Sequence, residues 1–188
     1  LDAAARIWAS YPDERLGALM DQFIALLGRA QMPDGYLYTY NQIHFPDVRW
    51  QNLQIEHELY CHGHLIEAGV SHFESTGVSG LLEIAQRAAD RIVADFQGKG
   101  AEYTPGHEEI EVALLRLYEV LESPAGSSAD FPAVTRQAYQ HHAYLELAQQ
   151  FIEQRGRMRF FARSIFQQNQ AVTKRGKIIR QRKQEYLT

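Results

Sequence analysis

The stretch His57-Glu58-Leu59-Tyr60-Cys61-His62-Gly63-His64 lies inside a long amphipathic run that extends from about residue 49 to residue 76. It places three histidines and the only cysteine of the chain within eight residues. On a helix that advances about 100° per residue, His57, Cys61 and His64 fall within about 60° of one another. Apolar side chains gather on the opposite face, namely Leu59, Ile66, Val70 and Phe73. This pattern predicts a helix that separates a packed core from a polar cavity.

Further helices are predicted on both sides of this run. One begins after Pro12-Asp13 and stops at residues 32–35, and another runs from a cap at Ser79 to a stop at Gly98. Two more are expected at about 107–121 and 133–154, and the last 30 residues also have helical character. The aromatic residues 36–40 are expected to form a structured loop or a short strand pair.

Short connections between these helices predict an all-α fold of antiparallel helix hairpins. The predicted helix starts near residues 49, 79, 107 and 133 are about 30, 28 and 26 residues apart, which is typical of a helical-hairpin solenoid or a toroid of helix pairs. This spacing does not distinguish an interaction scaffold from an enzyme, so the polar residues have to decide.

Composition is that of an ordinary globular domain, with 45% hydrophobic and 22% charged residues in 188. No apolar run approaches the roughly 20 residues that span a bilayer, and no secretory signal pattern is found at the start of the chain. We therefore expect no membrane partner and a cytoplasmic location, unless a signal segment precedes Leu1. A single cysteine allows no intramolecular disulfide.

Charge is unevenly distributed along the chain. Residues 151–188 carry ten Lys or Arg and two Glu, a local charge of +8, although the whole chain has a net charge of −4. Such an end could contact an acidic surface. Aromatic residues are not interleaved with the basic ones and no nucleic-acid motif is recognised, so a solvated helix is favoured and no nucleic-acid partner is expected.

Three interpretations apply to the helix that carries His57. A zinc site formed by His57, Cys61 and His64 has suitable ligands at helical spacing, although no known zinc pattern is matched. Alternatively, Cys61 packs as a small apolar residue and the histidines bind helix ends or buried carbonyls. In the third interpretation His57 donates a hydrogen bond to a polar ligand such as a sugar. A mid-helix cysteine is a poor candidate for a nucleophile, and no pair of carboxylates has the arrangement that a glycosidase needs.

A second constellation is found at residues 105–111, where a Pro-Gly turn precedes the next helix. We expect His107 and Glu108 in the first turn of that helix, where a carboxylate is favoured by the helix dipole. If the helices that carry His57 and His107 are neighbours running the same way, both histidines point toward one cavity.

Several motifs in fixed order resemble bacterial β-L-arabinofuranosidases of glycoside hydrolase family 127, the DUF1680 domain. They are QMPDGYLYT (31–39), Arg49-Trp50, HELYCHGHLIEA (57–68), PGHEEIE (105–111), LYEV (117–120) and FIEQRG (151–156). The resemblance covers roughly residues 8–156. It implies an (α/α)6 barrel, here an incomplete toroid, formed by residues 1–156. The basic and helical segment 157–188 matches none of these motifs.

The resemblance also implies a retaining mechanism, in which a zinc-bound cysteine thiolate attacks the anomeric carbon and a glutamate serves as acid/base. In the family pattern the nucleophilic cysteine and the acid/base glutamate lie C-terminal to the FIEQRG motif (151–156). Neither they nor zinc are therefore expected in this chain, and Cys61 does not take the nucleophile's role. His57 and His107 match the histidines that bind the arabinofuranose. We therefore expect a sugar-binding part of a glycosidase that is inactive by itself. The alternative is a non-enzymatic helical-repeat interaction module, and in either case self-association is one way to cover exposed faces.

Overall fold

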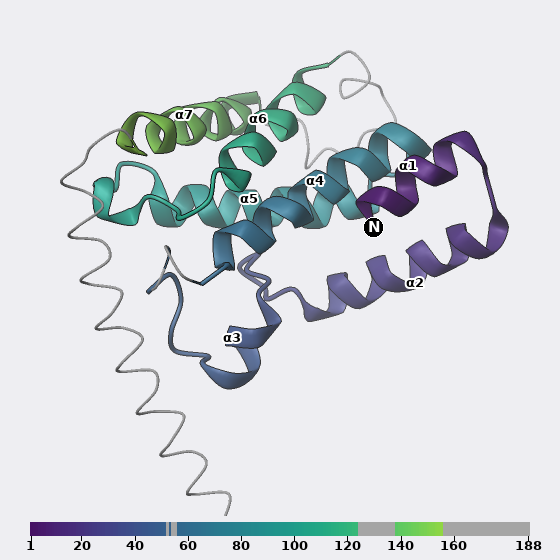
Figure 1. Ribbon diagram of the computed structural model, residues 1–188, viewed down its shortest axis with the longest axis horizontal. Coiled ribbons are helices and arrows are strands. Elements are labelled where there is room, and N and C mark those ends of the chain that lie inside the picture. Colours follow the sequence, from purple (N-terminus) through teal and green to yellow (C-terminus); the bar gives the residue numbers. More distant parts are fainter. Residues whose placement is uncertain (52, 54–55, 124–137, 156–188) are drawn as a thin grey trace, which may run out of the picture.

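The computed structural model describes residues 1–51, 53, 56–123 and 138–155, and within these ranges every regular element is helical (Figure 1). The elements are α1 (Asp2–Ser10), α2 (Glu14–Ala30), α3 (Thr39–His44), α4 (Glu58–Thr76), α5 (Gly80–Phe96), the 3-10 helix η1 (Ala101–Tyr103), α6 (Glu109–Glu122) and α7 (Ala138–Arg155). The predicted all-α class is therefore confirmed. The predicted segment 157–188 and the loop that follows Ser123 lie outside the described residues.

Helices α4 to α7 form two antiparallel hairpins that pack side by side (Figure 1). α4 and α6 run the same way, because His57 and His107 lie just before their first residues and their rings are 5.0 Å apart. α5 and α7 pack on the other side of the hairpins, where the Tyr144 hydroxyl donates to the Asp90 carboxylate. Parallel inner helices with return helices outside them are the arrangement of an (α/α) toroid, so the expected partial toroid is confirmed.

The apolar faces of these helices meet in a single core. The face of α4 that the sequence predicts to be apolar is buried as expected, with Leu59, Ile66 and Val70 all less than 3% exposed and Phe73 packed against them. Apolar residues of α5, α6 and α7 complete the core, among them Leu82, Ile92, Leu114, Leu117, Tyr144 and Phe151. This burial drives the packing of the hairpins.

Two glycines allow α4 to approach its neighbours closely. A Cβ atom on Gly69 would lie 2.7 Å from the Cβ of Ala85 in α5, and one on Gly63 would lie 2.7 Å from the Cγ of Glu109 in α6. Both distances are shorter than a carbon–carbon contact allows, so these glycines set how closely α4 packs on each side.

Several helix ends agree with the sequence. Asp13 accepts the Leu16 amide N–H at 2.8 Å and caps α2, and Gly77 ends α4 in the left-handed conformation with φ of 73°. Ser79 precedes α5 as predicted, although its hydroxyl donates to the Glu83 carboxylate instead of accepting a backbone N–H.

The start of α4 was predicted too early. The helix begins at Glu58, not near Arg49, and the described residues between them form a loop. In this loop Trp50 has φ of 58°, a conformation that a right-handed helix does not allow. The Glu58 carboxylate accepts the Trp50 N–H at 2.9 Å and holds this backbone in place.

No strand pair forms at residues 36–40, because residues 36–38 are a structured loop and α3 begins at Thr39. Met32 donates its amide N–H to the Tyr36 carbonyl at 2.9 Å, which closes a turn around Gly35. A Cβ atom on Gly35 would lie 2.1 Å from the Arg87 carbonyl oxygen, so the turn packs directly on α5.

Helix α6 begins later than predicted, and the predicted start of the last helix is not tested. α6 starts at Glu109, with Glu108 at its cap position, so His107 lies before the helix and not in its first turn. α7 is described from Ala138, and the predicted residues 133–137 fall outside the described ranges. No helix within those ranges is long and apolar enough to span a bilayer.

Candidate functional site

The structure brings His57 and His107 together, 50 residues apart in the chain. Their imidazole rings are stacked, with centroids 5.0 Å apart and an angle of 14° between the planes. Both residues are exposed and lie where α4 and α6 begin. The two parallel helices therefore present both imidazoles at the same end of the hairpins.

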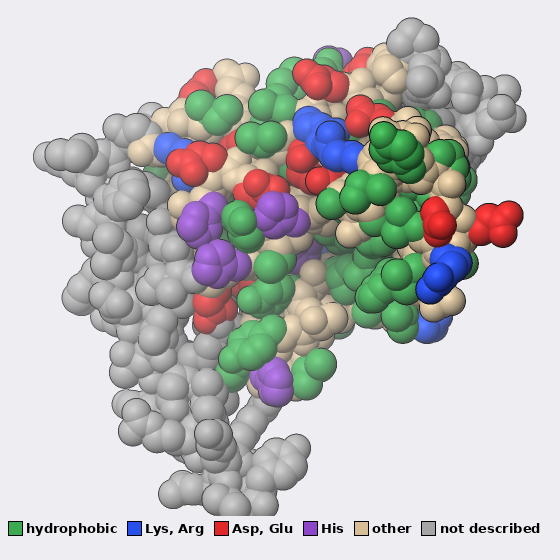
Figure 2. Space-filling view, turned by 45° about the vertical axis from the view of Figure 1, so that its right-hand side comes forward, with side chains coloured by type: hydrophobic (Ala, Val, Ile, Leu, Met, Phe, Trp, Pro, Cys, Tyr) green, Lys and Arg blue, Asp and Glu red, His purple; other side chains and the backbone are tan. Residues whose placement is uncertain are grey.

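Two side chains from the next turns of α4 join them. The Tyr60 ring stands edge-on to three rings, with centroids 5.5 Å from His57, 5.3 Å from His107 and 4.4 Å from His64. We call His57, Tyr60, His64 and His107 the histidine cluster. All four side chains are exposed, and Figure 2 shows histidines gathered on one face of the molecule.

One carboxylate lies within the reach of the histidine cluster. Glu109, at the start of α6, places Oε1 3.0 Å from Nδ1 of His64. This contact fits an N–H donor at Nδ1 of His64. It orients the His64 ring and joins α4 to α6 one turn beyond the stacked pair.

The turn that carries His107 is held by hydrogen bonds from two directions. Gly106 donates its amide N–H to the Leu53 carbonyl at 3.0 Å, which joins this turn to the loop before His57. From the other side, Arg155 at the end of α7 donates to the carbonyls of Pro105 at 2.9 Å and His107 at 2.6 Å. The same guanidinium contacts the buried Glu111 carboxylate at 2.6 Å.

The loop that leads to His57 is held by the Glu58 side chain, which points into the interior and is 1% exposed. Its carboxylate accepts the Tyr36 hydroxyl at 2.5 Å and the Trp50 amide N–H at 2.9 Å. Burial raises the pKa of Glu58, and these donors act in the opposite direction. Burial also raises the pKa of Tyr36, so the hydroxyl stays protonated as the donor.

Aromatic and cationic contacts complete this support. The Trp50 ring packs edge-on against Tyr36 at 5.2 Å, and its indole N–H donates to Asp95 at 2.8 Å. The Arg49 guanidinium lies 4.1 Å from the centroid of the Tyr36 ring and pairs with Asp34 at 2.6 Å. The described residues before His57 are thus fixed to the body of the protein.

His62 behaves as a structural histidine. It is fully buried, its Nδ1 lies 2.7 Å from the Glu58 carbonyl, and its Nε2 accepts the Leu37 amide N–H at 3.2 Å. Burial lowers its pKa to about 4, so the ring is neutral with the proton on Nδ1. Binding of a buried carbonyl by a histidine was one of the interpretations open from sequence, and it holds for His62.

Cys61 differs from the packing role expected for it, because its side chain is exposed. The surrounding protein atoms, and after them the Glu58 carboxylate, raise the pKa of the thiol above its usual value, which disfavours the thiolate. In the part of the chain that the structure describes, no three His, Cys, Asp or Glu side chains are placed to hold a metal ion. His57, Cys61 and His64 are among these residues, so they do not form the zinc site that is one interpretation of their spacing.

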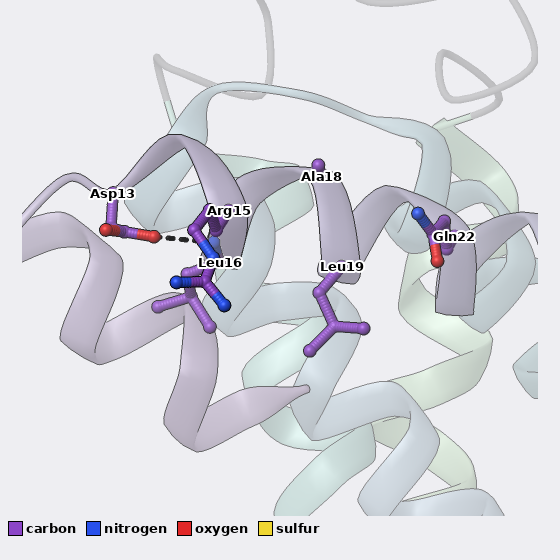
Figure 3. A pocket seen from close by; sticks show the side chains of 6 residues that line it. All are labelled: Asp13, Arg15, Leu16, Ala18, Leu19 and Gln22. Carbon is purple, nitrogen blue, oxygen red and sulfur yellow. Dashed lines mark hydrogen bonds between the residues drawn. The ribbon is translucent and has the colours of Figure 1, made fainter.

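A shallow hollow lies elsewhere, along the first turns of α2 (Figure 3). Its lining side chains are Asp13, Arg15, Leu16, Ala18, Leu19 and Gln22, and Asp13 serves there as the cap of the helix. No member of the histidine cluster lines this hollow, so the two surfaces are separate.

Sequence reasoning named His57 and His107 and missed the groups that hold them. Arg155 lies in one of the quoted motifs and in the last turn of its helix, but its contacts to Pro105 and His107 depend on tertiary structure. Tyr60 could have been found, because it is one turn from both His57 and His64 on the same helix.

Comparison with known proteins gives one family. A family model described as the catalytic domain of GH127 β-L-arabinofuranosidases matches residues 1–188. A non-reducing end β-L-arabinofuranosidase of Bifidobacterium longum subsp. longum is 44% identical over 128 residues, which cover 63% of this chain and 19% of that protein.

Solved structures agree with this match. A GH127 β-L-arabinofuranosidase from Geobacillus stearothermophilus T6 aligns with a TM-score of 0.71 and 42% identity, over 87% of this chain and 23% of the other. The GH127 β-arabinofuranosidase BT3674 aligns with a TM-score of 0.66 and 30% identity, over 82% and 23%. The chain thus spans about a fifth of the length of these relatives.

Proposed function

The chain belongs to the GH127 family of β-L-arabinofuranosidases, and from that membership we propose that it forms the part of the catalytic barrel that binds an arabinofuranosyl group. His57 and His107 are the proposed contacts to the sugar hydroxyls. The observation that carries this proposal is the stacking of the two exposed imidazoles, 5.0 Å apart, at the same end of two parallel helices.

The chemistry of the histidine cluster suits a sugar. A neutral imidazole has one N–H donor and one nitrogen acceptor, and a hydroxyl can use both. The Tyr60 ring beside them adds an apolar surface against which the C–H groups of a sugar ring can pack. Two imidazoles and one aromatic ring from two helices can therefore fix both the position and the orientation of a small polar ligand.

We propose that hydrolysis needs groups outside this chain. Its only cysteine lies in the motif 57–68, where the family resemblance places no nucleophile. The thiol is disfavoured as a thiolate by its surroundings, and the described residues offer no set of zinc ligands. The role of this chain is then to bind and orient the sugar.

A second candidate function rests on the exposed apolar side of α2. Leu19, Phe23 and Leu26 recur at helical spacing and are each about half exposed, at 48%, 50% and 50%. A stripe of this kind is typical of a surface that contacts another protein or another copy of the same chain. It favours the alternative of an interaction module.

Binding by histidine variants separates the two functions. We would titrate the full chain with methyl β-L-arabinofuranoside and follow binding by calorimetry. His57→Ala and His107→Ala should each weaken binding roughly tenfold, since each removes a hydrogen-bonding partner. His44→Ala, an exposed histidine on α3 outside the cluster, is the matched control and should bind as the wild type does. Equal binding by all four proteins, or no binding by the wild type, would favour the interaction module.

A further inference from the structure

Arg155 is the residue through which α7 reaches the sugar end of the hairpins. Its Nη1 donates to the Pro105 carbonyl at 2.9 Å and its Nη2 to the His107 carbonyl at 2.6 Å. Its Nε donates to the Glu111 carboxylate at 2.7 Å. One planar guanidinium therefore joins three acceptors on the turn before α6 and on α6 itself.

The Glu111 carboxylate makes this arrangement rigid. Its side chain is 3% exposed, and it lies in the first turn of α6. A buried carboxylate needs a cationic or hydrogen-bonding partner, so the contact with Glu111 fixes the position of the Arg155 guanidinium. Nε and Nη2 contact Glu111, while Nη1 and Nη2 donate to the carbonyls of the turn, so the planar guanidinium fixes their geometry.

The His107 ring depends on the backbone that Arg155 holds. The turn at residues 105–107 has no regular structure, and the Gly106 amide is bonded to the Leu53 carbonyl on the opposite side. Arg155 thus fixes the two carbonyls that flank Gly106, while the amide between them is fixed by the loop before His57. A shift of this backbone would move the His107 ring away from the His57 ring.

We propose that Arg155 is a positioning residue. Anchored by its contact with Glu111, it donates hydrogen bonds to the Pro105 and His107 carbonyls and so keeps the His107 imidazole stacked on His57. Its importance for sugar affinity rests on the function proposed above. Arg155 does not belong to the histidine cluster, and it acts through the turn.

Arg116 offers a matched control. Its side chain is 24% exposed against 20% for Arg155, and it also joins helices by ion pairs, to Glu67 at 2.7 Å and Glu74 at 3.0 Å of α4. Both of these partners are carboxylates of α4, and neither belongs to the His107 turn. Removing it tests the loss of a half-buried arginine without loss of the turn contacts.

The test combines two measurements on the full chain with ¹³C-labelled histidine. The first is the nuclear Overhauser effect between the His57 and His107 rings, which needs no sugar. The second is the dissociation constant for methyl β-L-arabinofuranoside. Arg155→Met should abolish the ring-to-ring effect and weaken binding roughly tenfold. Arg116→Met should keep the ring-to-ring effect and bind within about twofold of the wild type.

Arg155→Lys is the conservative variant, and it covers the case in which Arg155→Met does not fold. Lysine keeps the ion pair with Glu111 but cannot reach both carbonyls in the same plane, so we expect a weakened ring-to-ring effect in a folded protein. An unchanged effect in a folded Arg155 variant, or an equal loss in Arg116→Met, would overturn the proposal. If the wild type binds no sugar while the ring-to-ring effect still depends on Arg155, the proposed function fails and the positioning role stands.

Discussion

Three histidines at the start of α4, His57, His62 and His64, differ in their surroundings, and this difference separates their roles. His62 has both ring nitrogens bonded to backbone groups inside the protein, whereas His57 and His64 are exposed at the surface. Only the exposed rings are accessible to a ligand. Residue type and spacing alone do not make this distinction, because all three lie within eight positions.

Burial of neutral His62 predicts a loss of stability in acid. Its pKa is about 4 in the folded protein and about 6.5 when exposed. Between these values the unfolded chain binds the proton more readily, so the free energy of unfolding falls as pH drops from about 6.5 toward 4. The total loss approaches about 3 kcal/mol once the pH is below 4.

Urea unfolding of the wild type and His62→Asn at several pH values measures this contribution. Asparagine can donate to the Glu58 carbonyl but does not titrate in this range. The difference in unfolding free energy between the two proteins should therefore shrink as the pH falls. A difference that does not change with pH, or a His62 Cε1 resonance that titrates near 6.5, would contradict this assignment.

At the scale of elements, α4 is placed by its glycines. Gly69 faces α5 and Gly63 faces α6, and at each position an added methyl group would collide with the neighbouring helix. The atoms opposite Gly69 belong to a short side chain and to the backbone of α5, so they cannot rotate out of the way. The separation of α4 from α5 is therefore fixed at that position.

Gly69→Ala should destabilise the protein by about 1–3 kcal/mol, since the new Cβ would lie 2.7 Å from that of Ala85. Gly80→Ala is the control, because a Cβ there has no atom within 4 Å among the described residues. It should leave stability unchanged or raise it by up to about 1 kcal/mol. Thermal unfolding of both variants gives the comparison, and a Gly69→Ala protein as stable as the control would show that the helices can separate freely.

Helix ends were predictable where their signal is local. Asp13 and Gly77 act through their own side chain or backbone conformation, and the sequence places the start of α2 after Asp13 and the end of the α4 run at residue 76. The start of α4 was missed, because the sequence pattern stays helical through residues 49–57, whereas the Trp50 backbone has a positive φ and its N–H is bound by the Glu58 carboxylate. The turn at residues 32–35 was predicted from its local stop signal and is confirmed, whereas its packing on α5 was not predicted, because that contact is tertiary.

At the scale of the whole molecule, the chain matches part of the GH127 architecture, since it spans about a fifth of the length of its relatives. The family and the all-helical class followed from ordered motifs, and both are confirmed by the matches to GH127 proteins. The sequence also pointed to His57 and His107, because each lies next to a helix start in a motif. Their stacking and its support by Arg155 could not be predicted, since these contacts join residues about 50 positions apart.

The chain alone should not hydrolyse β-L-arabinofuranosides. The raised pKa of its single cysteine disfavours the thiolate, and no set of zinc ligands is found among the described residues. Incubation of the purified chain with an aryl β-L-arabinofuranoside, with and without added zinc, should release no aryl alcohol above the buffer rate. Turnover that requires zinc and disappears in Cys61→Ala would show instead that this thiol takes part.

The central claim is that a sugar binds against the stacked imidazoles of His57 and His107. The most direct measurement is the intermolecular nuclear Overhauser effect between methyl β-L-arabinofuranoside and the full chain with ¹³C-labelled histidine. The account predicts effects from the sugar ring protons to both His57 and His107 and none to the buried His62. Effects confined to His44 or His142, or saturable binding without an effect to either ring of the stacked pair, would contradict it.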